Sequence, residues 1–414
     1  MSELYDIFRR HPRISTDTRR IEPGSVFFAL HGATFDGNRF AADALSKGAA
    51  YAVVDDPAAV IGDRTVLVGD TLEALQELAR KHRRELAIPI LAISGSNGKT
   101  TTKELVSRVL AERFEVYATH GNLNNHIGVP LTLLAMTRDT EFGVVEMGAS
   151  ACGEIALLAS VAEPNYGILT NIGRAHLEGF GGPEGIRRGK GELLDYLAAN
   201  GGRAFVPRED EVLTNMAAER DGLAAEYYSA ALADGIAHHL EGDYNRFNIA
   251  AAVAVGRYFD IDGERIRHAV GSYMPDNNRS QRTETERNTL IVDCYNANPS
   301  SMRASVLNFL AEPAGGRSRR VLILGDMLEL GAWSEQEHRD IVALAGRNPD
   351  TELMLVGGEF ARACAGMEPQ PANTALFPSR EELIAELRRR PVENAFVLVK
   401  GSRGIGLEKA LEEL

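Results

Sequence analysis

Short apolar runs alternate with a longer amphipathic stretch in the first part of the chain. Val26 to Leu30, Tyr51 to Val54 and Thr65 to Val68 are brief and mostly apolar, which predicts three strands. Leu72 to Arg84 places apolar residues at helical spacing and predicts an amphipathic helix. We therefore expect a small unit of alternating strands and helices over residues 1–86.

The same rhythm continues in a second unit, where the apolar runs are more continuous. Ile88 to Ser94, Phe142 to Met147 and Tyr166 to Ile172 predict buried strands, and a helix is expected from about Thr100. Strands separated by helices in this order predict a parallel sheet that is covered on both faces. This unit is expected to span residues 87–275.

A polar, proline-containing break at Met274 to Ser280 predicts the start of a third unit, residues 276–414. The alternation resumes there and predicts a doubly wound, Rossmann-like domain. The fold prediction is therefore α/β with three domains: a small first domain, a central parallel-sheet domain like that of P-loop ATPases, and the doubly wound domain, with sites in the clefts between them. The strands expected in the third unit are Thr289 to Asp293, Arg320 to Asp326, Glu352 to Gly357 and Ala395 to Lys400.

Composition and charge narrow the class of protein. With 414 residues, 44% hydrophobic and 25% charged, the chain has the profile of a globular protein too long for one core. A formal net charge of −13 argues against non-specific nucleic-acid binding. The amino terminus has no apolar signal region and the apolar runs are too short to cross a membrane, so we expect a cytoplasmic protein without membrane insertion. Cysteines 152, 294 and 364 are scattered, which suggests a reducing compartment and three buried thiols.

A glycine-rich turn joins the strand that ends at Ser94 to the next helix. Glycines let backbone N–H groups approach phosphate oxygens, and a helix start adds the positive end of its dipole. We expect Lys99 to reach the β- and γ-phosphates of ATP and Thr100 to bind Mg²⁺. Ile93 stands where the usual pattern has its first glycine, so a plain turn is the alternative. The candidate ATP-binding residues here are Gly95, Ser96, Asn97, Gly98, Lys99, Thr100 and Thr101.

This form of the phosphate loop resembles that of the Mur ligase superfamily. Other stretches resemble the branch of that family that joins D-alanyl-D-alanine to UDP-N-acetylmuramoyl-tripeptide, and the D-N-P-R motif of the sister ligase that adds meso-diaminopimelate is absent from the sequence. The resemblance covers all three expected domains. It implies an ATP-dependent ligase of cytoplasmic peptidoglycan precursor synthesis, which we expect to be a monomer. The stretches are Gly121 to Leu134, Thr170 to Phe180, Tyr295 to Pro299, Gly325 to Gly331 and Val399 to Arg403.

Residues near strand ends of the second unit are candidate metal ligands. Glu146 ends an apolar strand, where the carboxyl edge of a sheet opens into a cleft and a hard carboxylate suits Mg²⁺. A solvated glutamate is the alternative there, and a structural histidine is the alternative for His176. The resemblance implies that both residues hold Mg²⁺.

Lys190 gives two different expectations. It lies in the stretch R-R-G-K-G-E-L-L, which we expect to begin a helix, and its charge alone predicts a surface lysine. The resemblance instead implies a lysine carbamate, an anion able to stabilise Mg²⁺. The catalytic set implied by the resemblance is Lys99, His176, Lys190 and Arg279.

Polar residues of the second and third units are candidates for binding the nucleotide. Asn245 and Asn248 precede an expected helix, Ile249 to Gly256, where their amides suit an adenine edge and helix capping is an equally good alternative. The resemblance implies adenine contacts for both, and a contact from Arg279 to the γ-phosphate, which suits the fork of a guanidinium. It also implies a ribose contact for Asp293 and a wall beside it, where an ordinary strand-to-helix loop is the alternative. That wall comprises Tyr295 and Asn298, with Asn296 on the substrate side.

Candidate substrate residues come from each unit. Thr18, Arg19 and Asn38 lie in polar loops that resemble the uridine and diphosphate site of the family. Lys400, Ser402 and Arg403 end a strand and are expected to open a helix, whose cationic, N–H-rich start suits the carboxylate of an incoming dipeptide. A solvated basic loop is the alternative for this second set. The resemblance adds three asparagines of the second unit, Asn122, Asn124 and Asn125.

The implied reaction has two steps. The tripeptide carboxylate attacks the γ-phosphate of ATP to give an acyl-phosphate and ADP, and the dipeptide amine then displaces phosphate. Closure of the domains is expected to bring Arg279 to Lys99, which predicts an open form in the absence of ligands. The alternatives are another carboxylate–amine ligase of the superfamily and a nucleotide-dependent switch protein that hydrolyses ATP without ligation. The identity of the third residue of the tripeptide is left open.

Overall fold

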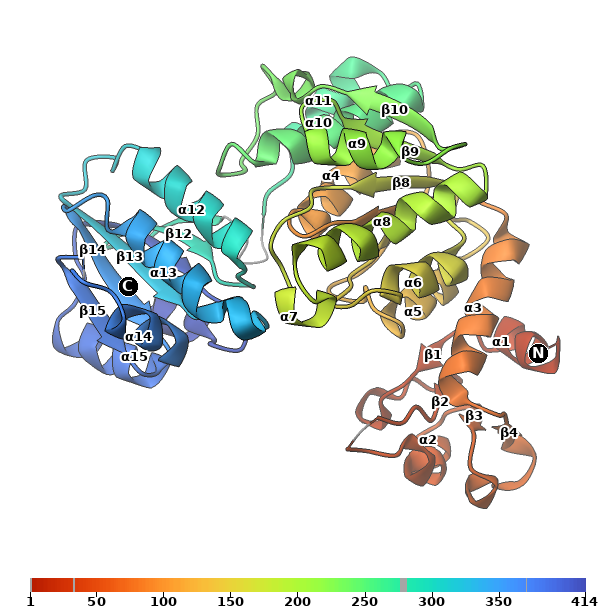
Figure 1. The fold of residues 1–414 in the computed structure, drawn as a ribbon. Helices are drawn as coiled ribbons and strands as arrows, with labels where there is room; N and C mark the ends of the chain where they lie inside the picture. Colours follow the sequence, from red (N-terminus) through yellow and green to blue (C-terminus); the bar gives the residue numbers. More distant parts are fainter. Residues whose placement is uncertain (1, 33, 276–280, 370) are drawn as a thin grey trace.

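The computed structural model describes residues 2–32, 34–275, 281–369 and 371–414. It contains three separate sheets, and the middle sheet lies between the two outer ones, with the chain termini at opposite ends of the molecule (Figure 1). Each sheet falls within one of the three predicted units, so the α/β, three-domain prediction is confirmed. The boundaries at residues 86/87 and 275/276 stay predictions.

The N-terminal sheet is small and parallel throughout, with strand order β1-β2-β3-β4. Its strands have only two to four residues, and α3 packs along one face of the sheet and continues into the middle domain. Asp70 caps α3 by accepting a hydrogen bond from the backbone N–H of Glu73, and Ala87 ends it in the left-handed conformation. The elements are α1 (Ser2–Arg10), β1 (Ile14–Ser15), β2 (Val26–Phe28), α2 (Ala41–Ser46), β3 (Tyr51–Val54), β4 (Thr65–Leu67) and α3 (Thr71–Leu86).

Three arginines of α3 attach the N-terminal domain to the middle domain. Arg83 is buried and donates to the carbonyls of Ala162 and Glu163, at the end of α6. Arg80 donates to the carbonyl of Ser160 and Arg84 pairs with the carboxylate of Glu163. Because carbonyls at a helix C-terminus lack partners within the helix, these arginines satisfy them while joining the domains.

The middle sheet is parallel, with order β10-β9-β8-β5-β7-β6. Alternate residues of β5 enter two different cores: Leu91 and Ile93 face helices α4, α10 and α11, whereas Ile90 and Ala92 face the side of α3, α6 and α8. Burial on both faces explains why this strand is apolar throughout. The elements are β5 (Ile90–Ser94), α4 (Lys99–Ala111), β6 (Val116–Ala118), α5 (Gly128–Leu134), β7 (Phe142–Glu146), α6 (Glu154–Ala162), β8 (Tyr166–Leu169), α7 (Leu177–Phe180), α8 (Pro183–Ala199), β9 (Arg203–Pro207), α9 (Glu211–Ala218), β10 (Ala224–Tyr228), α10 (Asn245–Tyr258) and α11 (Gly263–Gly271).

The C-terminal sheet has order β11-β12-β16-β13-β14-β15, and only the edge pair β11–β12 is antiparallel. The chain leaves β12 outward to β13, β14 and β15 and returns in β16 between β12 and β13, which makes the doubly wound arrangement that was predicted. The elements are β11 (Gln281–Glu284), β12 (Thr289–Asp293), α12 (Pro299–Ala311), β13 (Arg319–Gly325), α13 (Ser334–Ala345), β14 (Thr351–Val356), α14 (Gly358–Ala365), β15 (Thr374–Phe377), α15 (Arg380–Arg389) and β16 (Ala395–Lys400).

Local element predictions were wrong in three places that bear on the site. Asn245 and Asn248 lie inside α10 and do not precede it. Lys190 lies in the middle of α8, because Pro183, which fits the first helical turn, begins the helix seven residues earlier. After Lys400 the chain makes turns before a 3₁₀-helix at Leu407–Glu413, so the segment of Ser402 and Arg403 does not open an α-helix.

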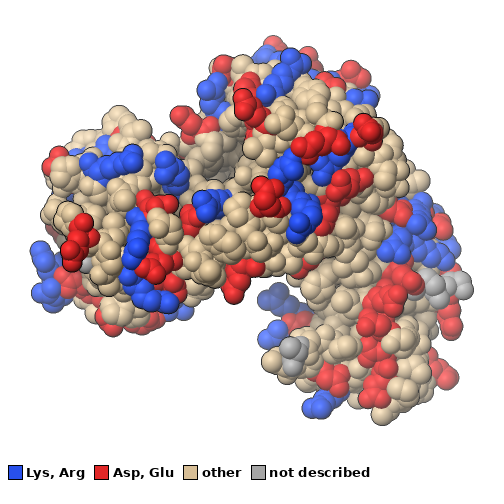
Figure 2. All heavy atoms as spheres, in the orientation of Figure 1, with Lys and Arg blue, Asp and Glu red and all other residues tan. Residues whose placement is uncertain are grey.

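Other sequence expectations have mixed outcomes. Cys294 and Cys364 are buried, but Cys152 is exposed, so the expectation of three buried thiols was wrong for Cys152. Within the described residues no helix is long and apolar enough to cross a membrane. On the face drawn in Figure 2, acidic and basic side chains are intermixed over all three domains.

Candidate active site

A cleft of about 1480 Å³ lies where the three domains meet. Its lining includes the phosphate loop, the N-terminal end of α3, the loop after β6, and the loops after β12, β13 and β16. Most of these segments follow the carboxyl ends of parallel strands, where open α/β sheets bind ligands. The candidate residues that line it are Ser96, Asn97, Gly98, Lys99, Thr101, Asn122, Asn124, Asn125, Glu146, His176, Asn245, Asn248, Asp293, Tyr295, Asn296, Asn298, Lys400, Ser402 and Arg403.

Two glycines of the phosphate loop are required by its backbone and its neighbours. Gly95 has φ +134° and Gly98 has φ +78°, conformations that favour glycine. A Cβ atom on Gly95 would lie 2.0 Å from Oγ1 of Thr170, and one on Gly98 would lie 2.7 Å from Oδ1 of Asn248. The loop therefore passes close to two other segments and presents its backbone at the start of α4.

Lys99 and Thr100 start α4 with their side chains in the loop. The ammonium of Lys99 donates to the carbonyls of Gly95 (2.9 Å) and Ser96 (3.1 Å), so it lies across the mouth of its own loop. Oγ1 of Thr100 donates to the Glu146 carboxylate at 2.9 Å. The amide of Asn124 donates to the other oxygen of that carboxylate at 2.7 Å. A hydroxyl and a buried carboxylate side by side are hard oxygen donors of the kind that Mg²⁺ prefers.

Lys190 is buried, with 1% of its surface exposed, so its expectation as a surface lysine was wrong. Its ammonium donates to the carbonyl of Ala149 at 3.1 Å and lies 5.1 Å from the ring centre of Phe180. Burial, aided by the positive charge of Lys99, lowers the pKa of Lys190 to about 7. A substantial fraction of this amine is therefore neutral near neutral pH, and the neutral amine is the form that reacts with CO₂.

His176 lies at the junction of the middle and C-terminal domains. It precedes α7 in the left-handed conformation (φ 53°), and its Nδ1 contacts the Glu329 carboxylate, which belongs to the C-terminal domain. Burial lowers the pKa of the His176 imidazole, an effect that the Glu329 carboxylate opposes. The ring is thus positioned by a carboxylate at the edge of the cleft.

Asn245 and Asn248 tie α10 to its surroundings through their side chains. The amide of Asn248 accepts from Oγ1 of Thr102 at 3.0 Å and donates to the side chain of Asn245 at 2.8 Å. Asn245 in turn donates to the carbonyl of Glu241 at 2.6 Å. The residue at the N-cap of α10 is Tyr244, so the capping alternative for the two asparagines was wrong.

The C-terminal wall of the cleft is built around a buried ion pair. The Lys400 ammonium contacts the Asp293 carboxylate at 2.5 Å, and Ser305 donates to the same oxygen at 2.8 Å. Ser402 accepts from the backbone N–H of Leu328 at 3.0 Å. The Arg403 guanidinium lies 5.5 Å from the ring centre of Tyr295. Lys400 is therefore a partner of Asp293, while Arg403 is exposed toward the cleft.

Asn298 serves both the helix and the cleft. Its side chain caps α12 by accepting from the N–H of Ser301, and its amide donates to the side chain of Asn97 at 2.7 Å. The C-terminal domain therefore already contacts the phosphate loop. Arg279, which closure is expected to bring to Lys99, lies outside the described residues, so the expectation of an open form stays a prediction.

The candidates in the N-terminal domain lie outside the lining of this cleft as far as the described residues show. Arg19 pairs with Asp17, and Thr18 is its neighbour in a 3₁₀ turn. Asn38 is buried and donates to Asp36 (3.0 Å) and Asp55 (2.7 Å), so its amide holds two loops together.

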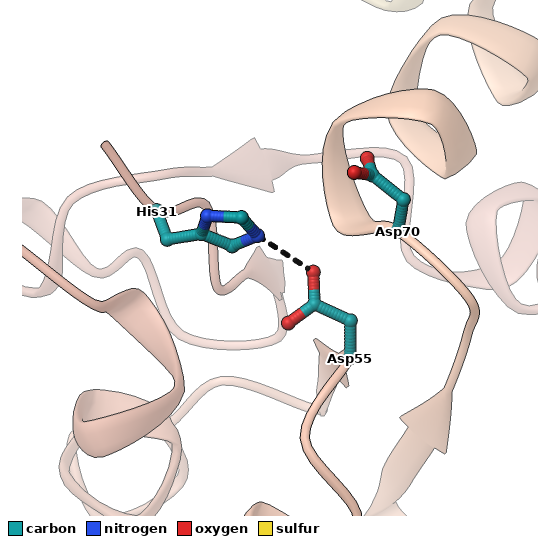
Figure 3. A group of neighbouring side chains, drawn as sticks. All are labelled: His31, Asp55 and Asp70. Atoms are coloured by element: carbon teal, nitrogen blue, oxygen red, sulfur yellow. Dashed lines mark hydrogen bonds and ion pairs between the residues drawn. The ribbon is translucent and has the colours of Figure 1, made fainter. Parts of the chain in front are cut away.

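Asp55 also joins a group of three possible metal ligands, His31, Asp55 and Asp70, whose ligand atoms lie within 4.8 Å of one another (Figure 3). The Oδ2 atom of Asp55 is already used, because it contacts His31 at 3.1 Å and accepts from both the backbone N–H and the hydroxyl of Thr71. Asp70 caps α3. These hydrogen bonds and the helix cap explain the positions of the three side chains, so we assign no metal ion to them.

Sequence reasoning missed the contacts that join the middle and C-terminal domains. Arg174 pairs with the buried carboxylate of Glu337 at 2.7 Å, and its backbone N–H donates to Ser300 at 2.7 Å. Glu329 meets His176 in the same region. Glu329 lies in the stretch Gly325 to Gly331 that carried part of the resemblance, but its pairing depends on how two domains dock.

Comparison with known proteins identifies the class. Three family models match the chain in sequence: "Mur ligase family, catalytic domain" at residues 12–83, "Mur ligase middle domain" at 93–248 and "Mur ligase, glutamate ligase domain" at 278–403. The chain belongs to the Mur ligase family, and it is an ATP-dependent ligase that forms a carbon–nitrogen bond.

Individual relatives narrow the branch of the family. The UDP-N-acetylmuramoyl-tripeptide–D-alanyl-D-alanine ligase of Bacillus subtilis is 32% identical over 97% of this chain and 92% of its own length. The enzyme of that name from Escherichia coli is also 32% identical, over 97% and 93%. Among solved structures, MurF from Acinetobacter baumannii matches with a TM-score of 0.86 at 29% identity, over 97% of this chain and 93% of its own. MurF from Thermotoga maritima in complex with ADP matches with 0.84 at 25% identity, over 99% and 97%.

Proposed function

We propose that this ligase joins D-alanyl-D-alanine to UDP-N-acetylmuramoyl-tripeptide, with ATP as the energy source, in the cytoplasmic synthesis of peptidoglycan precursors. The observation that carries the proposal is the single cleft in which a phosphate loop faces a charged wall from the C-terminal domain. The relatives that match nearly the whole chain carry the name of this reaction.

The chemistry needs an electrophilic phosphate and no side-chain nucleophile. The tripeptide carboxylate attacks the γ-phosphorus and ADP leaves, after which the dipeptide amine attacks the acyl carbon, loses its proton and releases phosphate. Lys99 and the N–H groups at the start of α4 are placed to stabilise negative charge on the phosphates. Arg279 has the same task in this proposal, from the C-terminal domain.

Mg²⁺ fits the donor set of the cleft. Thr100 and Glu146 would hold one ion, and His176 with a carbamate on Lys190 would hold a second. The ions supply positive charge that shields the γ-phosphate from the incoming carboxylate. Glu146 and Asn124 already share a hydrogen bond, so the loop after β6 is positioned by the same carboxylate.

The nucleotide is assigned to the cleft, and the uridine diphosphate of the precursor to loops of the N-terminal domain outside the described cleft lining. Asn245 and Asn248 are proposed to contact adenine, with Asp293, Tyr295 and Asn298 on the ribose side. The uridine diphosphate is assigned to the loops of Thr18, Arg19 and Asn38. The asparagines after β6, together with Asn296, would guide the peptide toward the γ-phosphate.

ADP release with purified protein tests the proposal. We expect release to require UDP-N-acetylmuramoyl-tripeptide and D-alanyl-D-alanine together, and mass spectrometry to detect the pentapeptide product. Lys99→Ala, which removes the cation of the phosphate loop, is the inactive control. ADP release that ignores both substrates would favour the switch protein, and release with a different amine would favour another ligase of the family.

A further inference from the structure

The loops after β13 and β16 face each other across the carboxyl edge of the C-terminal sheet. β13 and β16 are neighbouring parallel strands, with Leu324 opposite Lys400. Beyond them the Leu328 N–H donates to Oγ of Ser402 at 3.0 Å. A Cβ atom on Gly404 would lie 2.8 Å from Cδ1 of Leu328, so the two loops are in close contact. Glu329 and Arg403 are the next residues along the chain from this hydrogen bond, so they lie on the two adjoining loops.

The two side chains carry opposite charge and line the same cleft. The other charged pair on this wall, Asp293 and Lys400, is buried and joined at 2.5 Å. Glu329 keeps 62% of its side chain exposed despite its contact with His176, and Arg403 is exposed. Glu329 and Arg403 are thus the charges of this wall, among the described lining residues, that remain accessible to a ligand.

The backbone at Glu329 supports a functional reason for its position. Glu329 has φ +62°, a conformation in which a residue other than glycine is strained. Its carbonyl accepts from the N–H of Glu178 at 3.3 Å, and its carboxylate contacts His176. The strained backbone thus directs a carboxylate to the edge of the middle domain beside His176, in the same cleft as Lys99.

We infer that Glu329 binds the ammonium group of the incoming dipeptide, while Arg403 binds the carboxylate that the sequence already predicts for it. This inference rests on the proposed function and names the amine-substrate site within it. An extended dipeptide spans roughly 7 Å and carries one charge at each end, so it suits two opposite charges on adjoining loops of one cleft. Leu328, which precedes Glu329 and is 42% exposed, offers an apolar contact for the methyl groups of alanine. Glu329 then holds the amine on the side of the cleft where His176 lies.

Kinetics of variants in the full-length enzyme test the assignment. Because glutamine keeps an acceptor oxygen but removes the negative charge that faces the ammonium, Glu329→Gln should raise the KM for D-alanyl-D-alanine about 10- to 100-fold. The KM values for ATP and for the UDP-linked tripeptide should change less than about 3-fold, since these ligands are assigned elsewhere. Glu329→Asp, which keeps the charge on a shorter stem, should recover part of the loss. Glu178→Gln is the matched control, because Glu178 lies at the same domain contact but outside the described cleft lining.

Analogues of the dipeptide that lack one charged group show which charged group each residue binds. N-propionyl-D-alanine keeps the carboxylate and lacks the amine, whereas D-alanyl-D-alanine amide keeps the amine and lacks the carboxylate. Used as competitive inhibitors, both should bind the wild type more weakly than the zwitterionic dipeptide does. In Glu329→Gln the propionyl compound, but not the amide, should bind as well as the dipeptide. In Arg403→Met the amide, but not the propionyl compound, should do so.

Three results would overturn the assignment. An unchanged KM for the dipeptide in Glu329→Gln would show that Glu329 does not bind the ammonium group. An equal rise of all three KM values would make Glu329 a residue of domain docking. A propionyl deficit that persists in Glu329→Gln would assign the ammonium to another group. A wild-type enzyme that does not consume D-alanyl-D-alanine would instead refute the proposed function itself.

Discussion

Single residues in and around this cleft differ from what their side-chain type suggests. Lysine is usually solvated, yet Lys190 and Lys400 are both 1% exposed. Their environments differ: Lys400 is paired with the Asp293 carboxylate, whereas Lys190 donates to a carbonyl and feels the positive charge of Lys99. A buried lysine without a carboxylate partner, such as Lys190, is driven toward the neutral amine.

Lys190→Ala tests the role of this buried lysine. We expect a loss of kcat of at least about 100-fold, because the carbamate that would hold the second Mg²⁺ is gone and transition-state charge is less stabilised. Acetate or a longer carboxylic acid added to the assay should restore part of the activity by filling the vacated space. Full activity in Lys190→Ala, or inactivity that no carboxylic acid relieves, would show that the buried lysine serves packing alone.

At the scale of elements, the phosphate loop depends on helix α10 as much as on its own sequence. Asn248 of α10 accepts a hydrogen bond from Thr102 of α4 and lies against Gly98. The side chain that is proposed to contact adenine therefore also holds α4, the helix that follows the phosphate loop. Nucleotide binding and the α4–α10 contact share one residue.

Asn248→Ala and Thr102→Val separate these two tasks. Asn248→Ala should raise the KM for ATP more than it lowers kcat, because an adenine contact is the same in the ground and transition states. Thr102→Val removes the hydrogen bond but keeps the asparagine, so its KM for ATP should change less than about 3-fold. Both should lower the free energy of unfolding by about 1–3 kcal/mol, as expected when a buried polar group loses its partner. Equal KM values in the two variants would assign Asn248 to structure only.

At the scale of the whole molecule, the outer domains are attached in different ways. The N-terminal domain is joined by the continuous helix α3 and its arginines. The C-terminal domain meets the middle domain through side-chain contacts, among them those of Arg174 with Glu337, of His176 with Glu329 and of Asn97 with Asn298. Burial raises the pKa of Glu337, and the positive charge of the Arg174 guanidinium opposes that rise.

The Arg174–Glu337 pair is expected to stabilise docking of the C-terminal domain. Arg174→Met leaves a buried carboxylate unpaired, so it should lower the unfolding temperature more than Glu337→Gln does. The double variant should recover part of the loss, with a coupling energy of about 1–3 kcal/mol in a double-mutant cycle. Because half of the Arg174 side chain is exposed, we expect the lower end of this range. Additive effects would show that the two residues act independently.

The sequence by itself determined the architecture and the phosphate loop. Strands that are buried on both faces are apolar throughout, so β5 and β7 could be predicted from their own residues. A turn that passes close to other segments requires glycines, so the loop from Gly95 to Thr100 could be predicted in the same way. The edge strands β6 and β10 were missed, because mostly partly buried strands of three and five residues give too weak a periodicity.

Only the tertiary structure decided which polar residues are paired, buried or free. Lys190 is buried because α8 packs on the sheet, and Lys400 pairs with Asp293 because the ends of β12 and β16 are adjacent. Glu329 lies beside His176 because two domains dock there. None of these contacts lies between neighbours in sequence. Charge and burial at such positions depend on distant segments, and for that reason the residue pattern alone left Lys190 a surface lysine and Glu329 unnoticed.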